Sequence, residues 1–230
     1  MNLSSFWDEF ITKGGYVMVL EGLRATLLIA IFGLLIGLII GSLLAVFKLL
    51  PSRKLFPRIL NGFANVYVTL FRGTPMVVQL LIVHFVLFPL IGINIPAEVE
   101  GTIAFGLNSG AYICEIMRGG ILSVDKGQME AGRAVGLSYG QTMLRIVIPQ
   151  AIKNVIPTLG NELIVLIKET SVIGFIAVTD LTRAFQTMAS NSYQYIISYL
   201  VLAVVYLVLV LIATVIIRFV ERRLRAGDRR

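Results

Sequence analysis

The chain alternates long apolar runs with short polar segments. Each run holds at least the roughly 20 residues that a helix needs to cross a bilayer. We therefore predict membrane-spanning segments at Leu23–Phe47, Ile59–Ile91, Ala97–Met117, Val155–Val178 and Ile196–Phe219. The polar connections between them are Lys48–Arg58, Gly92–Pro96, Arg118–Lys153 and Thr179–Tyr195.

The second run, Ile59–Ile91, is too long for one straight span. It has 33 residues, which would form a helix of about 50 Å against an apolar bilayer core of about 30 Å. The sequence Arg72-Gly73-Thr74-Pro75 interrupts it, and proline removes a backbone donor while glycine loosens a helix. The run is either two short spans or one broken, tilted span.

The distribution of basic residues decides between these alternatives. Lys48–Arg58 holds four lysines and arginines, Arg118–Lys153 holds five, and the tail Arg218–Arg230 holds six. With these three segments inside, the count is 15 against 2 outside, as the positive-inside rule requires. If Ile59–Ile91 formed two spans, the first basic segment would lie on the opposite side of the membrane from the other two. We predict five spans, with the N-terminus outside and the C-terminus in the cytoplasm.

Composition agrees with an all-α integral membrane protein that forms one transmembrane domain over residues 1–230. The chain is 57% hydrophobic and 14% charged, whereas soluble domains are about 25% charged. The topology explains the net charge of +7, so no nucleic-acid partner is expected. The N-terminus lacks the basic start of a signal peptide, and no cleavable signal is predicted. The basic tail predicts contact with anionic lipid.

Several classes of chemistry are disfavoured by residue counts. One cysteine, Cys114, excludes an internal disulfide and a cysteine-based zinc site, and is expected to pack as a small apolar residue. The single His84 lies among apolar residues and is interpreted as packed or hydrogen-bonded. The chain lacks a G-x-x-x-x-G-K-[ST] phosphate loop, so it cannot hydrolyse nucleotide by that route. No metal or cofactor is expected in this chain.

The loop within residues 118–153 is the one sizeable segment outside the membrane. We predict a turn at Val124–Gly127, a short helix at Met129–Val135 and a second helix at Ser138–Val147. Ser138 with Gln141 has capping-box spacing. Pro149 is expected to stop or bend the chain where it re-enters the membrane.

This loop resembles the motif of the permease subunits of ABC importers. That motif is Glu-Ala-Ala, three residues, Gly, nine residues, then Ile-x-Leu-Pro. The present chain keeps this spacing with glycine for the second alanine and isoleucine for leucine. The matching residues are Glu130, Ala131, Gly132, Gly136, Ile146 and Pro149.

Further stretches are similar to the polar amino-acid uptake branch of these permeases, namely Gly22–Ala30, Phe71–Pro75 with Gln79, Glu115–Gly120, Gly127–Gln128 and Leu166–Ser171. The resemblance implies a type I importer in a bacterial plasma membrane. It implies two permease subunits, two ATP-binding subunits that use ATP and Mg²⁺, and an external substrate-binding protein. The loop would then be the coupling helix that contacts the ATPase. A homodimer is favoured, and a heterodimer is the alternative.

Polar side chains inside the spans are candidates for the transport path, because they are costly in lipid. Asn108, Tyr112 and Glu115 share one face of the third span. Asn161 and Glu162 share a face of the fourth span with Thr158, Val165 and Glu169. Predicted substrate-binding residues are Glu162, Asn161, Glu115, Tyr112, Asn108, Thr74 and Gln79. Predicted gate or ion-pair residues are Lys168, Glu169 and Arg72.

The charged side chains of the third and fourth spans have a formal balance of minus two per subunit, from Glu115, Glu162, Glu169 and Lys168. This balance favours arginine, lysine or histidine as substrate. Glutamine or glutamate is the alternative substrate. Rival classes are an ion-coupled secondary transporter and a membrane-embedded enzyme. Instead of binding substrate, Glu115 could form an ion pair with Arg118 or with a residue of another helix and stabilise the fold. Gly33, Gly37 and Gly41 form a packing face against either the same subunit or its twin.

Overall fold

The computed structural model describes residues 3–50 and 54–226. The last residues of the basic tail, 227–230, and residues 51–53 of the first basic connection lie outside this range. The described residues form α1 (Leu3–Trp7), a π-helix (Asp8–Thr12), α2 (Gly15–Leu49), α3 (Leu55–Gly73), α4 (Met76–Ile82), a π-helix (Val83–Leu87), α5 (Phe88–Ile91), α6 (Ala97–Leu122), α7 (Lys126–Ala134), α8 (Tyr139–Thr142), a π-helix (Met143–Val147), α9 (Ile148–Glu169), a 3₁₀-helix (Thr170–Ile176), α10 (Leu181–Ser192) and α11 (Tyr195–Ala226).

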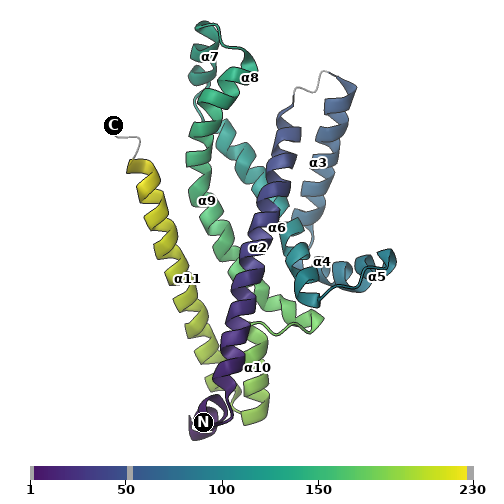
Figure 1. Cartoon of the computed structure of the whole chain (residues 1–230), viewed down its shortest axis with the longest axis vertical. Coiled ribbons are helices and arrows are strands. Elements are labelled where there is room, and N and C mark those ends of the chain that lie inside the picture. Colours follow the sequence, from purple (N-terminus) through teal and green to yellow (C-terminus); the bar gives the residue numbers. More distant parts are fainter. Residues whose placement is uncertain (1–2, 51–53, 227–230) are drawn as a thin grey trace.

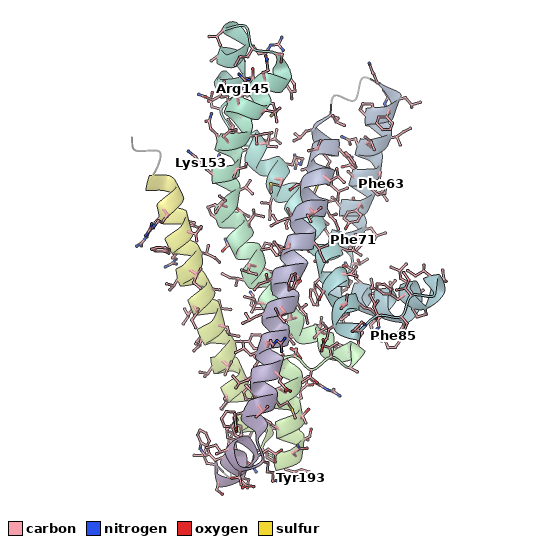
Figure 2. The ribbon with its side chains drawn as sticks, in the orientation of Figure 1. Phe63, Phe71, Phe85, Arg145, Lys153 and Tyr193 are labelled. Carbon is pink, nitrogen blue, oxygen red and sulfur yellow. The ribbon has the colours of Figure 1, made fainter. Side chains whose placement is uncertain are left out.

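The helices α2, α3, α6, α9 and α11 run roughly along the long axis of the molecule (Figure 1). The end of α2, the start of α3, the α7–α8 loop and the end of α11 all lie at one end. The described parts of the three basic segments therefore lie toward the same end of the molecule, as the charge count predicts. Arg145 and Lys153 lie toward this end and Tyr193 lies at the opposite one (Figure 2). Near that opposite end the exposed aromatic residues include Trp7, Tyr16, Tyr193, Tyr195 and Tyr199, as in the aromatic belt of a membrane interface.

The helices α2 and α11 are more apolar than α6 and α9. Among the described residues, length and hydropathy alone select α2 and α11 as spans, with the bent pair Leu55–Gly73 and Met76–Ile91 as a third. The helices α6 and α9 run beside α2 but carry more polar side chains. Such polarity is expected of helices that pack against protein or line a path instead of facing lipid.

The helices α2 and α6 form the most extensive contact in the molecule. The stripe of Gly33, Gly37 and Gly41 faces Phe105, Ser109 and Ile113 of α6 in the same chain. Small residues allow two membrane helices to approach closely. The structure thus answers the question that the spacing left open, because the glycine face packs within the subunit.

The second apolar run is one broken segment. The chain turns by 110° between α3 and the following helix, so that α4 contacts α6 and α5 projects away from the long axis of the molecule (Figure 1). This agrees with a single interrupted span and accounts for the excess length of the run. Thr74 and Pro75 adopt extended backbone at the break.

Of the two outcomes expected at Pro149, a stop or a bend, the structure excludes the stop. Helical residues continue from Tyr139 through Pro149 to Glu169, so the expected second loop helix corresponds to α8 and the following π-helix and runs on into α9. A π-helical turn at Met143–Val147 precedes the proline, and another at Val83–Leu87 precedes Pro89. A π turn inserts an extra residue, and these two turns lie just before Pro89 and Pro149, which cannot donate a backbone hydrogen bond.

Other boundaries also differ from the predictions. The fourth span begins earlier and its α-helix ends at Glu169, after which Thr170–Ile176 form a 3₁₀-helix. The connection after it contains the helix α10, capped by the Asp180 carboxylate, which accepts hydrogen bonds from the backbone N–H groups of Thr182 and Arg183 at 3.0 and 2.9 Å. Segment Leu3–Thr12 is helical as well. These short helices lack long apolar runs, which is why hydropathy missed them.

Candidate functional site: a transport path and its cytoplasmic loop

The loop at the basic end is a compact pair of helical turns. The Asp125 carboxylate accepts a hydrogen bond from the Gly127 N–H at 2.7 Å and caps α7. Ser138 and Gln141 form the predicted capping box, with distances of 3.3 Å and 2.9 Å. Together these caps satisfy backbone donors at both helix starts. The loop therefore has a defined shape that can transmit a displacement to α9.

The six motif residues occupy different parts of this loop. Glu130 and Ala131 are exposed on α7, whereas Gly132 is buried against Thr142 and Ile146. Gly136 has φ +89°, with open space where a side chain would be. Pro149 is exposed near the start of α9, and Ile146 is half-buried. The motif glycines thus serve close packing and a left-handed turn.

Exposed apolar side chains surround the loop. Val135 is 78% exposed and Leu144 is 68% exposed, and the Tyr139 ring is also accessible. They belong to the segment from α7 to the start of α9, which lies at the basic end of the molecule (Figure 1). An apolar patch on a water-facing surface is typical of a protein contact.

The helix break joins three of the predicted substrate-binding residues. The Gln79 amide nitrogen donates to the carbonyl of Phe71 at 2.7 Å and to both the carbonyl and hydroxyl oxygens of Thr74 at 2.9 and 2.8 Å. The Asn108 amide nitrogen donates to the Gln79 side-chain oxygen at 2.8 Å. This network satisfies carbonyl groups that the break frees, as membrane-embedded backbone requires.

Arg72 and Tyr112 meet beside this network. The Arg72 guanidinium lies 5.4 Å from the centre of the Tyr112 ring, within the range of a cation–π contact. Both side chains are exposed in the single chain. The predicted gate residue Arg72 therefore contacts a predicted substrate-binding residue, and among the described residues it forms no ion pair with Glu169.

The polar residues of α9 divide between two faces. Asn161 is exposed, whereas Glu162 is buried and accepts a hydrogen bond from the Ser109 hydroxyl of α6 at 2.9 Å. Exposed positions recur along α9 at heptad spacing: Asn154, Thr158, Asn161, Val165 and Lys168. Polar side chains on the outside of a membrane helix call for a protein or water-filled neighbour. The side chains of this stripe are exposed in the single chain.

Glu115 is held by two cations. Lys48 Nζ lies 2.5 Å from one carboxylate oxygen, and Arg118 donates to the other at 2.7 and 3.0 Å. This is the ion pair given above as the alternative to substrate binding, with Lys48 as an additional partner. It ties the end of α2 to α6 just before the loop.

Two further predictions concern Lys168 and His84. Lys168 is exposed and Glu169 is half-buried at the end of α9, and within the described ranges they form no ion pair with each other. The His84 Nδ1 atom hydrogen-bonds the Glu100 carboxylate of α6, which confirms the interpretation of His84 as hydrogen-bonded. Residues 3–50 and 54–226 contain no group of three or more His, Cys, Asp or Glu placed to hold a metal ion.

Sequence reasoning missed Lys48, Ser109 and Glu100 as partners of these groups. Lys48 was counted only as a topology signal, although its place at the membrane boundary could have suggested a partner on a neighbouring helix. Ser109 carries no local signal, because its contact with Glu162 depends on how α6 faces α9.

Comparisons with known proteins agree with one another. A family model described as binding-protein-dependent transport system inner membrane component matches residues 33–226. A putative glutamine transport system permease protein GlnP of Rickettsia conorii is 40% identical over 90% of this chain and 92% of its own length. The arginine transport system permease protein ArtQ of Bacillus subtilis is 40% identical over 91% of this chain and 94% of its own length.

Solved structures show the same likeness. The crystal structure of an amino acid ABC transporter with histidines contains a chain that superposes with a TM-score of 0.83 at 37% identity. The match covers 93% of the present chain and 98% of that chain. The likeness therefore extends over all five passes and the loop.

Proposed function

We propose that this chain, which belongs to the binding-protein-dependent transport system inner membrane component family, carries cationic amino acids across the membrane by alternating access. It is a multi-pass inner-membrane permease subunit of an ABC importer for polar amino acids, and its relatives are permeases, not enzymes. Family membership also disfavours an ion-coupled secondary transporter. The proposed orientation has the N-terminus outside and the C-terminus in the cytoplasm.

The proposed partners follow from the family and from two surfaces. The exposed apolar side chains of the α7–α8 loop support docking of an ATP-binding subunit, which would hold ATP and Mg²⁺ while this chain holds no cofactor. The polar stripe on α9 supports pairing with a second permease, proposed as an identical copy, around a central path. An external binding protein would deliver the amino acid. Closure of the ATP-binding subunits would bring the two loops together and turn the path outward.

The proposal of a cationic substrate depends on the environment of the Glu162 carboxylate. Its carboxylate is buried at the α6–α9 contact and is hydrogen-bonded by the Ser109 hydroxyl, without a cation among the described residues. Glu115, by contrast, is neutralised by Lys48 and Arg118. The charge argument therefore rests on Glu162 and Glu169. The arginine permease relative and the transporter with histidines support the same substrate class.

Binding to the purified permease tests this proposal. We expect saturable arginine binding that Glu162→Gln weakens at least about tenfold, because removing one partner of a buried charge pair costs about 2–5 kcal/mol. Glu221→Gln, which removes a carboxylate from the far end of α11, is the matched control and should leave binding unchanged. The measurement is equilibrium binding of labelled arginine and glutamine in detergent.

One outcome would contradict the cationic substrate, and another would contradict the role of Glu162. Binding of glutamine without arginine would assign the path to uncharged amino acids, which is the second candidate because of the glutamine permease relatives. Equal arginine binding by the wild type and Glu162→Gln would remove Glu162 from the site. Either result leaves the importer family unchanged.

A further inference from the structure

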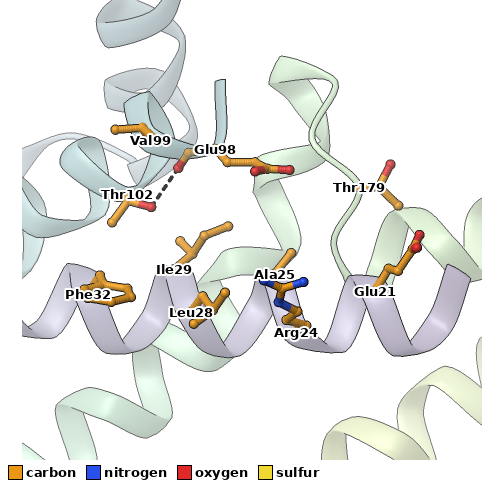
Figure 3. A pocket seen from close by; sticks show the side chains of 10 residues that line it. All are labelled: Glu21, Arg24, Ala25, Leu28, Ile29, Phe32, Glu98, Val99, Thr102 and Thr179. Atoms are coloured by element: carbon orange, nitrogen blue, oxygen red, sulfur yellow. Dashed lines mark hydrogen bonds between the residues drawn. The ribbon is translucent and has the colours of Figure 1, made fainter. Parts of the chain in front are cut away.

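A cavity of about 460 Å³ opens between the first turns of α2, the start of α6 and the segment that precedes α10. Its volume lies within the roughly 300–1,000 Å³ that is usual for small-molecule sites. It is separate from Glu162 and from the helix break. Figure 3 shows Glu98 of α6 opposite Arg24 and Glu21 of α2. Thr179 lies at the same end of the cavity as Glu21.

The polar end of this cavity holds one cation and two carboxylates. Arg24, Glu21 and Glu98 are all exposed, and in the described part of the chain none of them forms an ion pair. Their formal charges leave the cavity with one net negative charge. A ligand that matches them carries an anionic group for the arginine and an ammonium group for the carboxylates.

The position of Arg24 along α2 sets the depth of the cavity in the bilayer. Arg24 and Lys48 bracket residues 25–47, which contain no charged side chain. These 23 residues span about 34 Å as a helix, close to the roughly 30 Å of a bilayer core. Arg24 therefore lies at one membrane boundary, at the level of lipid headgroups.

The apolar end of the cavity extends from that boundary toward the membrane centre. Leu28 and Phe32 lie about one and two turns further along α2 and are 41% and 52% exposed. Side chains of this kind match an acyl chain. The order along the helix is thus charged groups at the headgroup level and apolar groups beneath them, which is the order within a phospholipid.

We propose that this cavity binds phosphatidylethanolamine. The Arg24 guanidinium would hold the phosphate with two parallel hydrogen bonds, as arginine does at oxyanions. The carboxylates of Glu21 and Glu98 would accept hydrogen bonds from the ethanolamine ammonium, while Leu28 and Phe32 contact the first acyl carbons. A phosphatidylglycerol headgroup lacks the cation, and a choline headgroup has no N–H to donate. The inference does not depend on which amino acid is transported.

Native mass spectrometry of the full permease, with any subunits that copurify, tests the proposal. The detergent-solubilised protein is offered dioleoyl-phosphatidylethanolamine, -phosphatidylcholine and -phosphatidylglycerol at equal concentrations. We expect about tenfold greater retention of phosphatidylethanolamine than of phosphatidylglycerol, a ratio equivalent to one charge-assisted hydrogen bond. Arg24→Gln should lower that retention about tenfold, and Glu98→Gln should remove the preference. Arg183→Gln, which changes an exposed arginine of α10, should behave as wild type.

Three results would overturn the proposal. Equal retention of the three lipids would show that the cavity does not select a headgroup. Equal retention by Arg24→Gln and Arg183→Gln would show that Arg24 takes no part. Displacement of the phosphatidylethanolamine by excess arginine or glutamine would assign the cavity to an amino acid. If Arg24→Gln fails to give a monodisperse protein, Glu98→Gln tests the ammonium contact independently, and an unchanged lipid preference in that variant would also overturn the proposal.

Discussion

Replacing Gly41 by leucine is expected to lower the unfolding temperature of the permease by about 2–12 °C. A Cβ atom at Gly41 would lie 2.7 Å from Cβ and Cγ2 of Ile113 and 2.8 Å from the Gly110 carbonyl oxygen. Ile113 is fully buried and has no room to move, so the two helices must separate. Overpacking costs about 1–3 kcal/mol, and each kcal/mol shifts the midpoint by about 2–4 °C in a domain of this size.

The measurement is thermal unfolding in detergent, followed by the loss of the monodisperse peak. Gly62→Leu is the matched control, because Gly62 is also within a helix and no atom lies within 4 Å of a Cβ built there. If the two variants unfold at the same temperature, α2 and α6 are not packed as closely at Gly41 as described above.

Much of this fold could be predicted from the hydrophobic pattern, because the thickness of the bilayer sets the length of each span. A helix that crosses the bilayer needs about 20 apolar residues, so the five passes follow from run lengths. The Ser138–Gln141 capping box was predictable because both partners are local in sequence. The glycine stripe of α2 was visible too, but its spacing fits any close neighbour. Only the arrangement of α6 shows which helix it meets.

The polar side chains were harder to place, because each depends on packing between helices. Periodicity put Asn161 and Glu162 on one face, yet one is exposed and the other contacts Ser109 of α6. The partners of Glu115 come from α2 and from its own helix, and a sequence does not show that Lys48 reaches it. The π turns before Pro89 and Pro149 were also missed, because proline alone does not distinguish a break from an inserted residue.

Replacing Gly136 by tryptophan is expected to reduce ATP-dependent uptake on the order of 100-fold, a loss of about 2.7 kcal/mol, which is typical of a residue at the centre of a protein interface. No atom lies within 4 Å of a Cβ at this position, so the indole would project outward from the loop. It would then occupy space that an ATP-binding subunit needs. Glu130→Arg, which reverses an exposed charge on α7, should weaken the same contact without backbone strain. The measurements are uptake in proteoliposomes and copurification of the ATP-binding subunit.

Gly14→Trp separates docking from backbone strain. Gly14 has φ +76° and Gly136 has φ +89°, and both have open space around a Cβ. Both substitutions therefore force a tryptophan into a left-handed conformation that disfavours side chains, but Gly14 lies at the end of the molecule away from the loop. We expect both variants to lose similar stability and only Gly136→Trp to lose the ATP-binding subunit. Wild-type copurification and uptake in Gly136→Trp would show that the α7–α8 loop does not couple this permease to ATP hydrolysis.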